Sequence, residues 1–511
     1  MTTPATPGPL AGPMMGPMAG PLVHDRKTSA GSLTDVRGVY IDGAWHEPEH
    51  GWFEDRCATT GETISDVPNA SPDQVGAAVA AARKAADTGD WPSADPAFRS
   101  RCLSQLAQAL EDARHELVAL GRVEWGCTAD EDRQQIDAPA MMAMGGSQMA
   151  LAPIEEALAA GGATGKVLVR HEPVGVVSVL TPWNFPHTLN LMKLAPALAA
   201  GNTVVLKPSP LAPLVGLAVA DLADRCTDLP PGVLNVVSTE GLEASQVLVT
   251  DPRVDMVSFT GATATGRQIM SMAGETLKRL LLELGGKSAT VVLDGTDLDA
   301  LLPRLLYDGC TFHAGQACIL RSRLLVPRPL LDATVTGLAD LARAVVVGDP
   351  LDPATQMGPL ISTDQAARVA GLVDRARQEG AVVAAGGSAP RGLEGTSFFA
   401  PTVLSGVDPR SEIAQSEVFG PVLCVVPYDD IDDAVALAND SAYGLAGSVW
   451  GPDDEVALAV ARRMRTGQVE VNGTGLGGSP FGGFKQSGFG REGGLIGLRS
   501  YTETKAIGFP A

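Results

Sequence analysis

Short β-branched runs alternate with segments of helical character in the stretch that begins at Gly175. The runs with strand character cover residues 175–180, 203–206, 233–237 and 254–259. The segments that we predict as helices between them cover residues 189–200, 215–225 and 244–249. Strands and helices that alternate at this spacing predict a parallel sheet with crossover helices, and therefore an α/β fold.

A second alternating region follows Gly285. Its strand-like runs cover residues 324–326, 382–384, 422–426 and 468–471, and its predicted helices cover 330–343, 364–378, 431–439 and 455–465. We find no sequence repeat between the two regions, so they predict two separate α/β domains. The first resembles a Rossmann-type dinucleotide-binding domain.

The N-terminal part of the chain predicts helices that follow a segment without fixed structure. Ser71, with Gln74 three residues on, forms a helix start, and a second long helix is predicted over residues 97–123. Residues 1–23 carry no charged side chain and are dense in Pro, Gly and Met. Since Pro and Gly interrupt the apolar run that a secretory signal needs, we interpret residues 1–36 as a disordered tail.

Charge and cysteine usage exclude several classes of protein. The chain has 511 residues and a formal net charge of −21, whereas a nucleic-acid-binding protein usually shows a basic stripe. Its seven cysteines are scattered, and no Cys-x-x-Cys motif occurs. This pattern predicts no disulfide framework, no zinc or other metal site, and a reducing cytoplasmic location. No apolar run is long enough to span a bilayer, so we expect no membrane insertion.

Three short phrases each carry one side chain suited to covalent catalysis at a carbonyl carbon. Asn184 lies in Thr-Pro-Trp-Asn-Phe-Pro, Glu283 in Leu-Glu-Leu-Gly-Gly-Lys, and Cys318 at the end of Gly-Gln-Ala-Cys. A thiol can attack the carbonyl, an amide can hold the oxyanion, and a carboxylate can activate water. Each residue alone has an ordinary alternative, namely a helix cap for the asparagine, a paired acid for the glutamate and a core residue for the cysteine.

In this order, the three phrases resemble those of the aldehyde dehydrogenase superfamily. The resemblance covers residues 39–505 and includes the phrases at 170–175 and 480–488. It implies that Cys318 is the nucleophile, that Asn184 belongs to the oxyanion hole, and that Glu283 activates the hydrolytic water. Lys193 and Glu492 match positions associated with proton relay in some members.

The same resemblance implies a fold of three parts and an oligomer. Residues 37–154 and 175–284 would form the NAD(P)-binding domain, and residues 285–494 the catalytic domain. Residues 155–174 and 495–511 would form a small oligomerisation sheet, which implies a homodimer or homotetramer.

The best cofactor motif lies where a predicted strand ends at residue 259 and a glycine turn leads into a helix. Helix N-termini suit a pyrophosphate. Two Gly-x-Gly-x-x-Gly matches near the C-terminus open no amphipathic helix, and a P-loop interpretation of residues 261–266 lacks the required Lys-Ser/Thr. By resemblance, the residues that contact NAD or NADP are Thr181, Trp183, Lys207, Ser209, Gly241, Gly261, Thr263, Gly266, Leu284, Glu417 and Phe419.

Two positions depart from the family's cofactor pattern. Ala262 stands where a serine is usual, which removes one hydroxyl from the phosphate turn. Pro210 stands where NAD-preferring members often carry glutamate, so no carboxylate repels the 2′-phosphate of NADP. Both NAD and NADP therefore remain candidates.

The resemblance also places the substrate pocket. Its side chains would be Leu189, Met192, Phe312 and Ile319, none of which is charged. The arginines of succinate-semialdehyde members and the tryptophan of betaine-aldehyde members are missing here, so we expect an apolar aliphatic, terpenoid or aromatic aldehyde. The alternatives are a semialdehyde-specific or CoA-acylating enzyme, a Cys–His hydrolase that uses His313, and a catalytically silent structural protein on the same fold.

Overall fold

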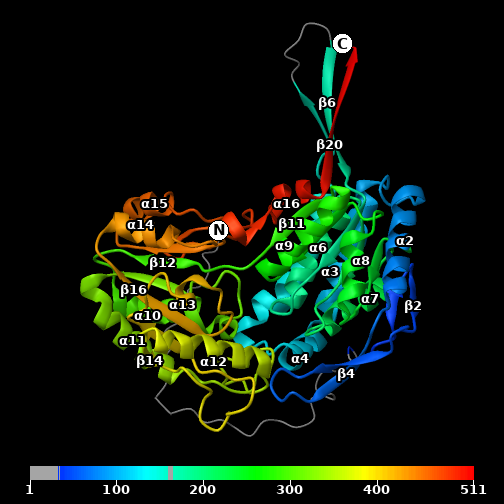
Figure 1. Cartoon of the computed structure of the whole chain (residues 1–511). Helices are drawn as coiled ribbons and strands as arrows, with labels where there is room; N and C mark the ends of the chain where they lie inside the picture. Colours follow the sequence, from blue (N-terminus) through cyan, green and yellow to red (C-terminus); the bar gives the residue numbers. More distant parts are fainter. Residues whose placement is uncertain (1–32, 34, 159–164, 511) are drawn as a thin grey trace.

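The computed structural model describes residues 33, 35–158 and 165–510 as two α/β lobes with a β arm that projects from the first lobe (Figure 1). The predicted tail lies almost wholly outside these residues. Leu33, however, is 9% exposed and packs in the core, so packed structure includes a residue that we had assigned to the tail. None of the helices in the described part of the chain is both long and apolar enough to cross a membrane.

The first lobe is built on an eight-stranded sheet whose order is β19-β11-β10-β7-β8-β9-β1-β2. The five central strands run parallel, and the outer strands β1, β2 and β19 pair antiparallel. The central strands are β7 (Val176–Leu180), β8 (Thr203–Lys207), β9 (Leu234–Val236), β10 (Met256–Thr260) and β11 (Arg279–Glu283), and the outer ones are β1 (Val39–Ile41), β2 (Ala44–His46) and β19 (Gly488–Phe489). The predicted parallel sheet is therefore confirmed.

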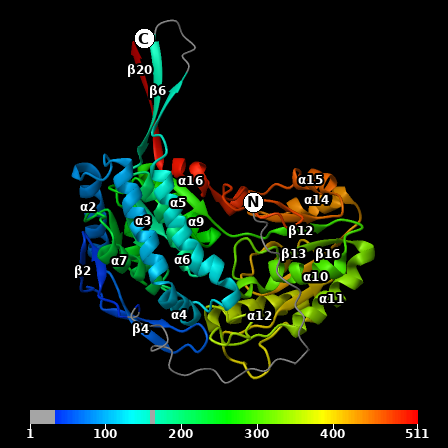
Figure 2. The same ribbon diagram turned by 180° about the vertical axis from the view of Figure 1, so that it is seen from behind.

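Helices cover both faces of this sheet. One face carries α2 (Pro72–Thr88), α8 (Leu242–Thr250) and α9 (Thr263–Ala273). The other carries α3 (Pro96–Asp112), α5 (Ala138–Ala150), α6 (Pro186–Ala199) and α7 (Leu214–Cys226), which Figure 2 shows from behind. Ser71 and Gln74 form the predicted capping box of α2.

The long helix that we predicted over residues 97–123 is two helices. It breaks at Ala113 between α3 and α4 (Arg114–Glu124). Ala113 has ψ 3°, far from the helical value, and it ends the first helix and begins the second. Alanine is the best helix former, so its presence gave no sign of the break.

The second lobe has a seven-stranded sheet in the order β14-β15-β16-β13-β12-β17-β18, which is parallel except for the β14–β15 pair. Helices α10 and α11 pack on one face, α14 and α15 on the other, and α12 and α13 belong to a third apolar cluster. The strands are β12 (Ala289–Val292), β13 (Arg323–Pro327), β14 (Val382–Ala385), β15 (Thr402–Ser405), β16 (Val422–Tyr428), β17 (Gly447–Trp450) and β18 (Glu470–Val471). The helices are α10 (Leu298–Leu306), α11 (Leu331–Ala344), α12 (Thr363–Gln378), α13 (Glu412–Gln415), α14 (Ile431–Asn439) and α15 (Asp454–Ala461).

Two small antiparallel sheets complete the fold. The arm is a three-stranded sheet of β5 (Glu155–Leu158), β6 (Gly165–Pro173) and β20 (Thr502–Pro510). Residues 494–500, most of which we had assigned to this sheet, form helix α16 (Gly494–Ser500), which lies against α5 and α6. A hairpin of β3 (Trp52–Arg56) and β4 (Thr63–Pro68) lies at the edge of the first lobe (Figure 1).

A buried pair of carboxyl groups joins this hairpin to two helices. Asp55 on β3 and Glu124 at the end of α4 are 1% and 0% exposed, and the charge of Glu124 acts on the Asp55 carboxyl group. Glu124 Oε1 also accepts from Leu214 N at 2.6 Å, where α7 begins without a side-chain cap of its own. Burial raises the pKa of Glu124 to about 8, and burial together with the Glu124 charge raises the pKa of Asp55.

This pair makes stability depend on pH. The native state retains a proton on Glu124 that the unfolded chain releases above its ordinary pKa of 4.5. The contribution to stability is therefore present in acid, is lost as pH rises to about 8, and is constant above that. We expect Glu124→Gln to raise the melting temperature at pH 8 more than at pH 5. Glu111→Gln, an exposed change on α3, is the control. Equal shifts at both pH values would contradict this account.

Candidate active site

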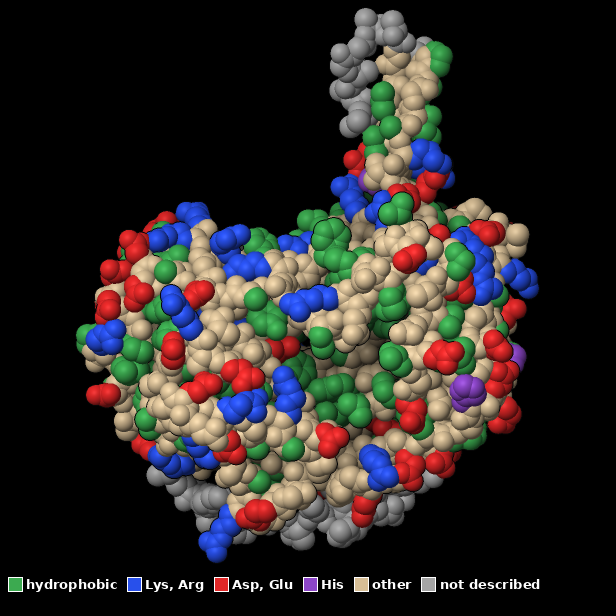
Figure 3. Space-filling model, in the orientation of Figure 1, with side chains coloured by type: hydrophobic (Ala, Val, Ile, Leu, Met, Phe, Trp, Pro, Cys, Tyr) green, Lys and Arg blue, Asp and Glu red, His purple; other side chains and the backbone are tan. Residues whose placement is uncertain are grey.

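The predicted site residues meet where the carboxyl ends of the central strands face the second lobe. In sequence order, β8 and β9 are added to the sheet on one side of β7, and β10 and β11 are then added on the opposite side of β7. Ligands of open α/β sheets bind at such a switch point. A cavity of about 280 Å³ opens there, and Figure 3 shows the surface hollowed between the two lobes. Its lining comprises residues 182–184, 260–262 and 283–285, with Cys318, Gln365, Arg368, Glu417 and Phe419.

The loop before Cys318 has an unusual backbone. His313, Ala314 and Gly315 all have positive φ, at 49°, 50° and 74°. A Cβ on Gly315 would lie 2.1 Å from Gly420 O, so only glycine fits there. The loop leads directly to the half-buried Cys318 on the cavity wall. Burial, together with the charges of Glu417 and Glu283, raises the pKa of its thiol.

Asn184 lies beside this loop although 134 positions separate it from Cys318 in the sequence. It is 3% exposed, and its Nδ2 donates to Gln316 O at 2.8 Å. Its neighbour Phe185 packs on the His313 ring, with ring centroids 5.0 Å apart. The amide therefore has a fixed place next to the thiol, as an oxyanion donor requires.

Glu283 is the last residue of β11 and reaches the same cavity. It is 2% exposed, and neither carboxylate oxygen has a hydrogen-bond partner among the described residues. A Cβ on Gly482 would lie 2.8 Å from Glu283 Oε1, so the backbone there passes close to the carboxylate. Burial, and next the charge of Glu492, raises the pKa of Glu283, whereas Lys193 and Arg491 lower it.

Lys193 and Glu492 form a buried ion pair. Lys193 Nζ lies 2.7 Å from Glu492 Oε1, and both side chains are 0% exposed. The two residues come from α6 and from the turn before α16, 299 positions apart. Of the two charges, Glu492 raises the pKa of Glu283 and Lys193 lowers it.

Glu417 and Phe419 reach the cavity from the second lobe. Glu417 Oε1 accepts from Gly286 N at 2.9 Å, and burial raises its pKa to about 7. The Phe419 ring meets the Trp183 ring edge-on, with centroids 5.2 Å apart. These contacts join the two lobes across the cavity.

The predicted phosphate turn has the expected geometry. β10 ends at Thr260, Gly261 N donates to Glu283 O, and α9 begins at Thr263 without a side-chain cap. Its first N–H groups are therefore available to an anion. A Cβ on Gly266 would lie 2.6 Å from Leu284 Cδ2, so glycine lets α9 pack closely on the sheet.

The other predicted cofactor residues are near the carboxyl ends of neighbouring strands. Lys207 ends β8 and is 8% exposed, its ammonium donates to Pro208 O, and burial lowers its pKa to about 8. Thr181 follows β7, and its N–H donates to Lys207 O at 3.2 Å. Ser209 is also 8% exposed, and Gly241 is the N-cap of α8. None of these four residues lines the cavity itself.

None of the four predicted substrate residues lines the cavity, and two of them, Phe312 and Ile319, flank the catalytic loop in the sequence. Phe312 packs between Phe185 and Tyr307, with ring centroids 5.6 and 5.4 Å apart. Leu189 is 8% exposed on α6, and Met192 and Ile319 are half-buried.

His313, the residue on which the hydrolase alternative depends, contacts two side chains of the first lobe. Its Nδ1 lies 3.1 Å from Gln135 Nε2 and 3.4 Å from Glu131 Oε2. This ring nitrogen therefore bonds to the first lobe and not to the thiol.

Sequence reasoning missed Gln365 and Arg368, which reach the cavity from α12. Arg368 donates to Glu417 O and Val418 O and so holds the segment that carries Glu417. An arginine on an ordinary amphipathic helix gives no sequence signal of such a role.

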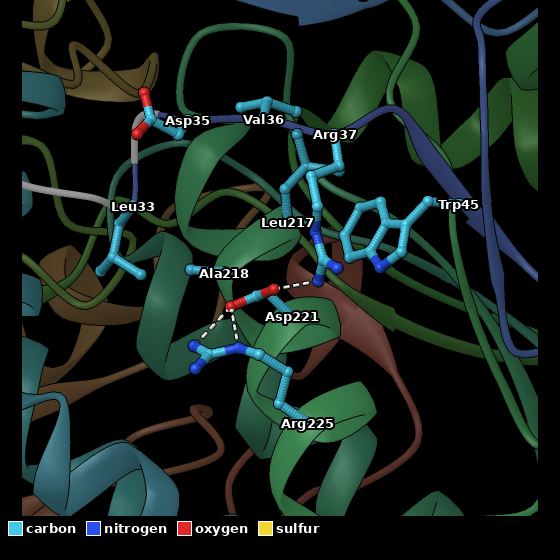
Figure 4. A pocket seen from close by; sticks show the side chains of 9 residues that line it. All are labelled: Leu33, Asp35, Val36, Arg37, Trp45, Leu217, Ala218, Asp221 and Arg225. Atoms are coloured by element: carbon cyan, nitrogen blue, oxygen red, sulfur yellow. Dashed lines mark hydrogen bonds and ion pairs between the residues drawn. The ribbon is translucent and has the colours of Figure 1, made fainter.

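A second cavity of about 310 Å³ lies between α7 and the segment that leads into β1 (Figure 4). Asp221 joins Arg37 and Arg225 there, and the Arg37 guanidinium lies over the Trp45 ring, 4.5 Å from its centroid. Three of its four charged side chains are thus paired with one another, the fourth being Asp35, and no predicted site residue lines it.

Comparisons with known proteins agree on the family. The model of the aldehyde dehydrogenase family matches residues 45–507. The chain is 39% identical to aminoacetaldehyde dehydrogenase of Pseudomonas aeruginosa over 94% of this chain and 96% of that protein. It is 38% identical to geranial dehydrogenase of Castellaniella defragrans over 93% and 98%.

Solved structures show the same fold. Betaine aldehyde dehydrogenase of Staphylococcus aureus, in complex with NAD⁺, has a TM-score of 0.92 at 34% identity and covers 95% of this chain and 97% of its own. A mutant of aldehyde dehydrogenase C from Pseudomonas syringae, in complex with NAD⁺ and octanal, has a TM-score of 0.88 at 37% identity over 92% and 96%. The predicted α/β fold is confirmed, and the chain belongs to the aldehyde dehydrogenase family.

Proposed function

We propose that this protein oxidises an aldehyde to its carboxylic acid, with NAD or NADP as electron acceptor. The observation that carries the proposal is the meeting of Cys318, Asn184 and Glu283 around one cavity. The carboxylate oxygens of Glu283 have no hydrogen-bond partner among the described residues. The uncapped N-terminus of α9 opens on the same cavity. A nucleophile, an oxyanion donor, a base and an anion-binding turn then lie within reach of one substrate.

The chain's residues divide the chemistry as follows. The Cys318 thiolate attacks the aldehyde carbon, and the oxyanion of the resulting thiohemiacetal accepts hydrogen bonds from the Asn184 amide and the Cys318 N–H. After oxidation, the acyl group is held as a thioester on Cys318. Glu283, whose pKa is raised, takes a proton from the water that attacks this thioester, and the carboxylic acid leaves.

The residues present fit a nicotinamide dinucleotide. The N–H groups at the start of α9 would hold its pyrophosphate, Lys207 and Ser209 its adenosine ribose, and Glu417 its nicotinamide ribose. When bound, the nicotinamide supplies the hydride acceptor for the oxidation. The loop after β8 carries Pro210 in place of an acid, so it suits both NAD and NADP.

We further propose an aldehyde with an apolar or aromatic chain. The rings of Phe185, Phe312 and Tyr307 form a continuous aromatic group beside the catalytic loop. The relatives include proteins named for geranial and for aminoacetaldehyde, and a neighbour structure contains octanal. Aromatic rings can bind both apolar chains and organic cations, so charge must be tested separately from shape.

A pair of aldehydes of the same shape makes that test. Betaine aldehyde and 3,3-dimethylbutanal differ only in a quaternary nitrogen against a quaternary carbon. We expect kcat/KM to be at least about tenfold higher for the neutral aldehyde, because an apolar pocket that offers the cation no anion to pair with makes its burial costly. Turnover is followed by the absorbance of the reduced nicotinamide, with NAD and NADP in parallel. A preference for the cation would assign the site to aminoaldehydes. Turnover that requires CoA would replace hydrolysis with thiolysis.

We propose that the arm mediates assembly into a homodimer or homotetramer. Ile507 and Phe509 are 38% and 43% exposed on β20, an outer strand of the arm sheet. Apolar side chains on an outer strand that projects into solvent are typical of a contact with another chain.

A further inference from the structure

We propose that Tyr501 and Ser258 are positioning residues, which hold the Lys193 ammonium against Glu492 and so fix the charges that face Glu283. The inference rests on the proposed role of Glu283 as the base that activates water. It assigns a part in catalysis to two hydroxyl groups that touch neither substrate nor cofactor.

The four side chains form an unbroken buried series. Tyr501 OH lies 2.9 Å from Ser258 Oγ, and this oxygen accepts from Lys193 Nζ at 3.3 Å. The ammonium also donates to Glu492 Oε1 at 2.7 Å. All four side chains are 0% exposed, so no solvent can replace a lost partner without a structural change.

Tyr501 is itself fixed by the elements around it. It lies between α16 and β20, where the body of the lobe meets the arm (Figure 1). Its backbone carbonyl accepts from Asn202 Nδ2 at 3.0 Å and from Val174 N at 3.3 Å. The phenol therefore reaches Ser258 on β10 from a rigid anchor, and Ser258 has its place in the middle of a parallel strand.

The Lys193 ammonium can hold its position because it has a second partner, Ser258 Oγ, besides Glu492 Oε1. Lys193 has a flexible side chain with three N–H donors, and among the described residues its recorded partners are these two oxygens. Removing the hydroxyl partner lets the ammonium rotate about its stem. The separation from Glu492 then increases or varies, and the field at Glu283 changes.

Glu283 is sensitive to that change because its own oxygens have no partner among the described residues. The titratable and charged groups that act on it or that it acts on are Glu492, Lys193, Arg491, Cys318 and Tyr501. Lys193 lowers the pKa of Glu283, and Glu492 raises it. A displaced ammonium leaves the Glu492 charge less compensated, so the pKa of Glu283 rises further.

Tyr501→Phe tests the proposal, with Tyr428→Phe as a matched control. Tyr428 is also buried, at 3% exposed, and its hydroxyl donates to Val292 O at 2.7 Å in the second lobe. Both variants lose one buried phenolic hydrogen bond, but only the first removes a contact of the Lys193 network. Each is compared with the wild type in steady-state pH profiles and in single-turnover production of reduced nicotinamide.

We expect Tyr501→Phe to keep the first turnover and to slow the steady state about three- to tenfold at neutral pH. The pH at which turnover reaches half its maximum should rise by about 0.5 to 1 unit, and the deficit should disappear in alkali. The profile of Tyr428→Phe should match the wild type. Ser258→Ala should shift the profile in the same direction, and it carries the test if Tyr501→Phe does not fold.

The outcomes separate this inference from the proposed function. A wild type that produces no reduced nicotinamide from any aldehyde overturns the proposed function. An active wild type whose pH profile is the same in folded Tyr501→Phe and Ser258→Ala overturns the positioning role alone. Loss of the first turnover together with the steady state also overturns it, because the hydroxyl groups would then act before the thioester stage.

Discussion

Cys318→Ala is expected to reduce aldehyde oxidation by on the order of 10⁴-fold or more, to the level of the protein-free reaction. Without the thiol, no covalent adduct forms, and neither Asn184 nor Glu283 can supply a nucleophile in its place. The assay is the absorbance of the reduced nicotinamide after mixing with an apolar aldehyde. Binding of NAD, followed by quenching of tryptophan fluorescence, should be retained because the α9 turn is untouched.

Cys310→Ala is the matched control for this substitution. Cys310 lies only eight residues upstream, but it is 0% exposed, and its Sγ lies 3.9 Å from Thr402 O. Its thiol cannot reach the cavity, so turnover should stay near the wild-type rate. If both variants lost turnover to a similar extent, the reaction would depend on the structure of the loop and not on the Cys318 thiol. Activity retained in Cys318→Ala would remove the nucleophile from the proposal.

The parallel core of the first lobe was predictable because its strands carry a strong local signal. β7, β8 and β10 are β-branched runs of five residues, and each is completely buried. Strands of this kind must be apolar on both faces, which the sequence shows directly. The prediction therefore came within two residues of each end.

Other strands were missed because local sequence does not distinguish them. β12, β15 and β17 have only four residues each, and β17 begins with a glycine. β12 and β15 are strands because they pair with β13 and β16, and β17 pairs in turn with β12. Such tertiary pairing outweighs intrinsic propensity, which is weak over four residues.

The candidate site also contains residues that the local sequence reveals and residues that it does not. The thiol, the carboxylate and the amide stand out because each sits in a distinctive phrase. The contact of Tyr501 with Ser258 does not, since 243 residues separate the two hydroxyl groups and each is ordinary in its own context. Only the packing of β10 against the base of the arm brings them together.

Glu283→Gln is expected to separate the two halves of the reaction. The amide has the shape of the carboxylate but cannot take a proton from water, and loss of a general base typically costs about 10²- to 10⁴-fold. Thiol attack and oxidation come before the attack of water on the thioester, and they do not need the base that this later step uses. We expect a burst of about one reduced nicotinamide per active site, followed by a slow steady state.

The burst is what distinguishes this variant from a general loss of activity. The acyl group should remain on Cys318, where mass spectrometry of the denatured protein would find it, and added hydroxylamine should restore turnover by attacking the thioester directly. Glu275→Gln, an exposed change beyond α9, should behave as the wild type. In the wild type, the steady state should increase with pH through the raised pKa of Glu283, since only the ionised carboxylate accepts the proton. A variant that neither forms the burst nor retains the acyl group would show that Glu283 acts before the thioester, for example on the thiol itself.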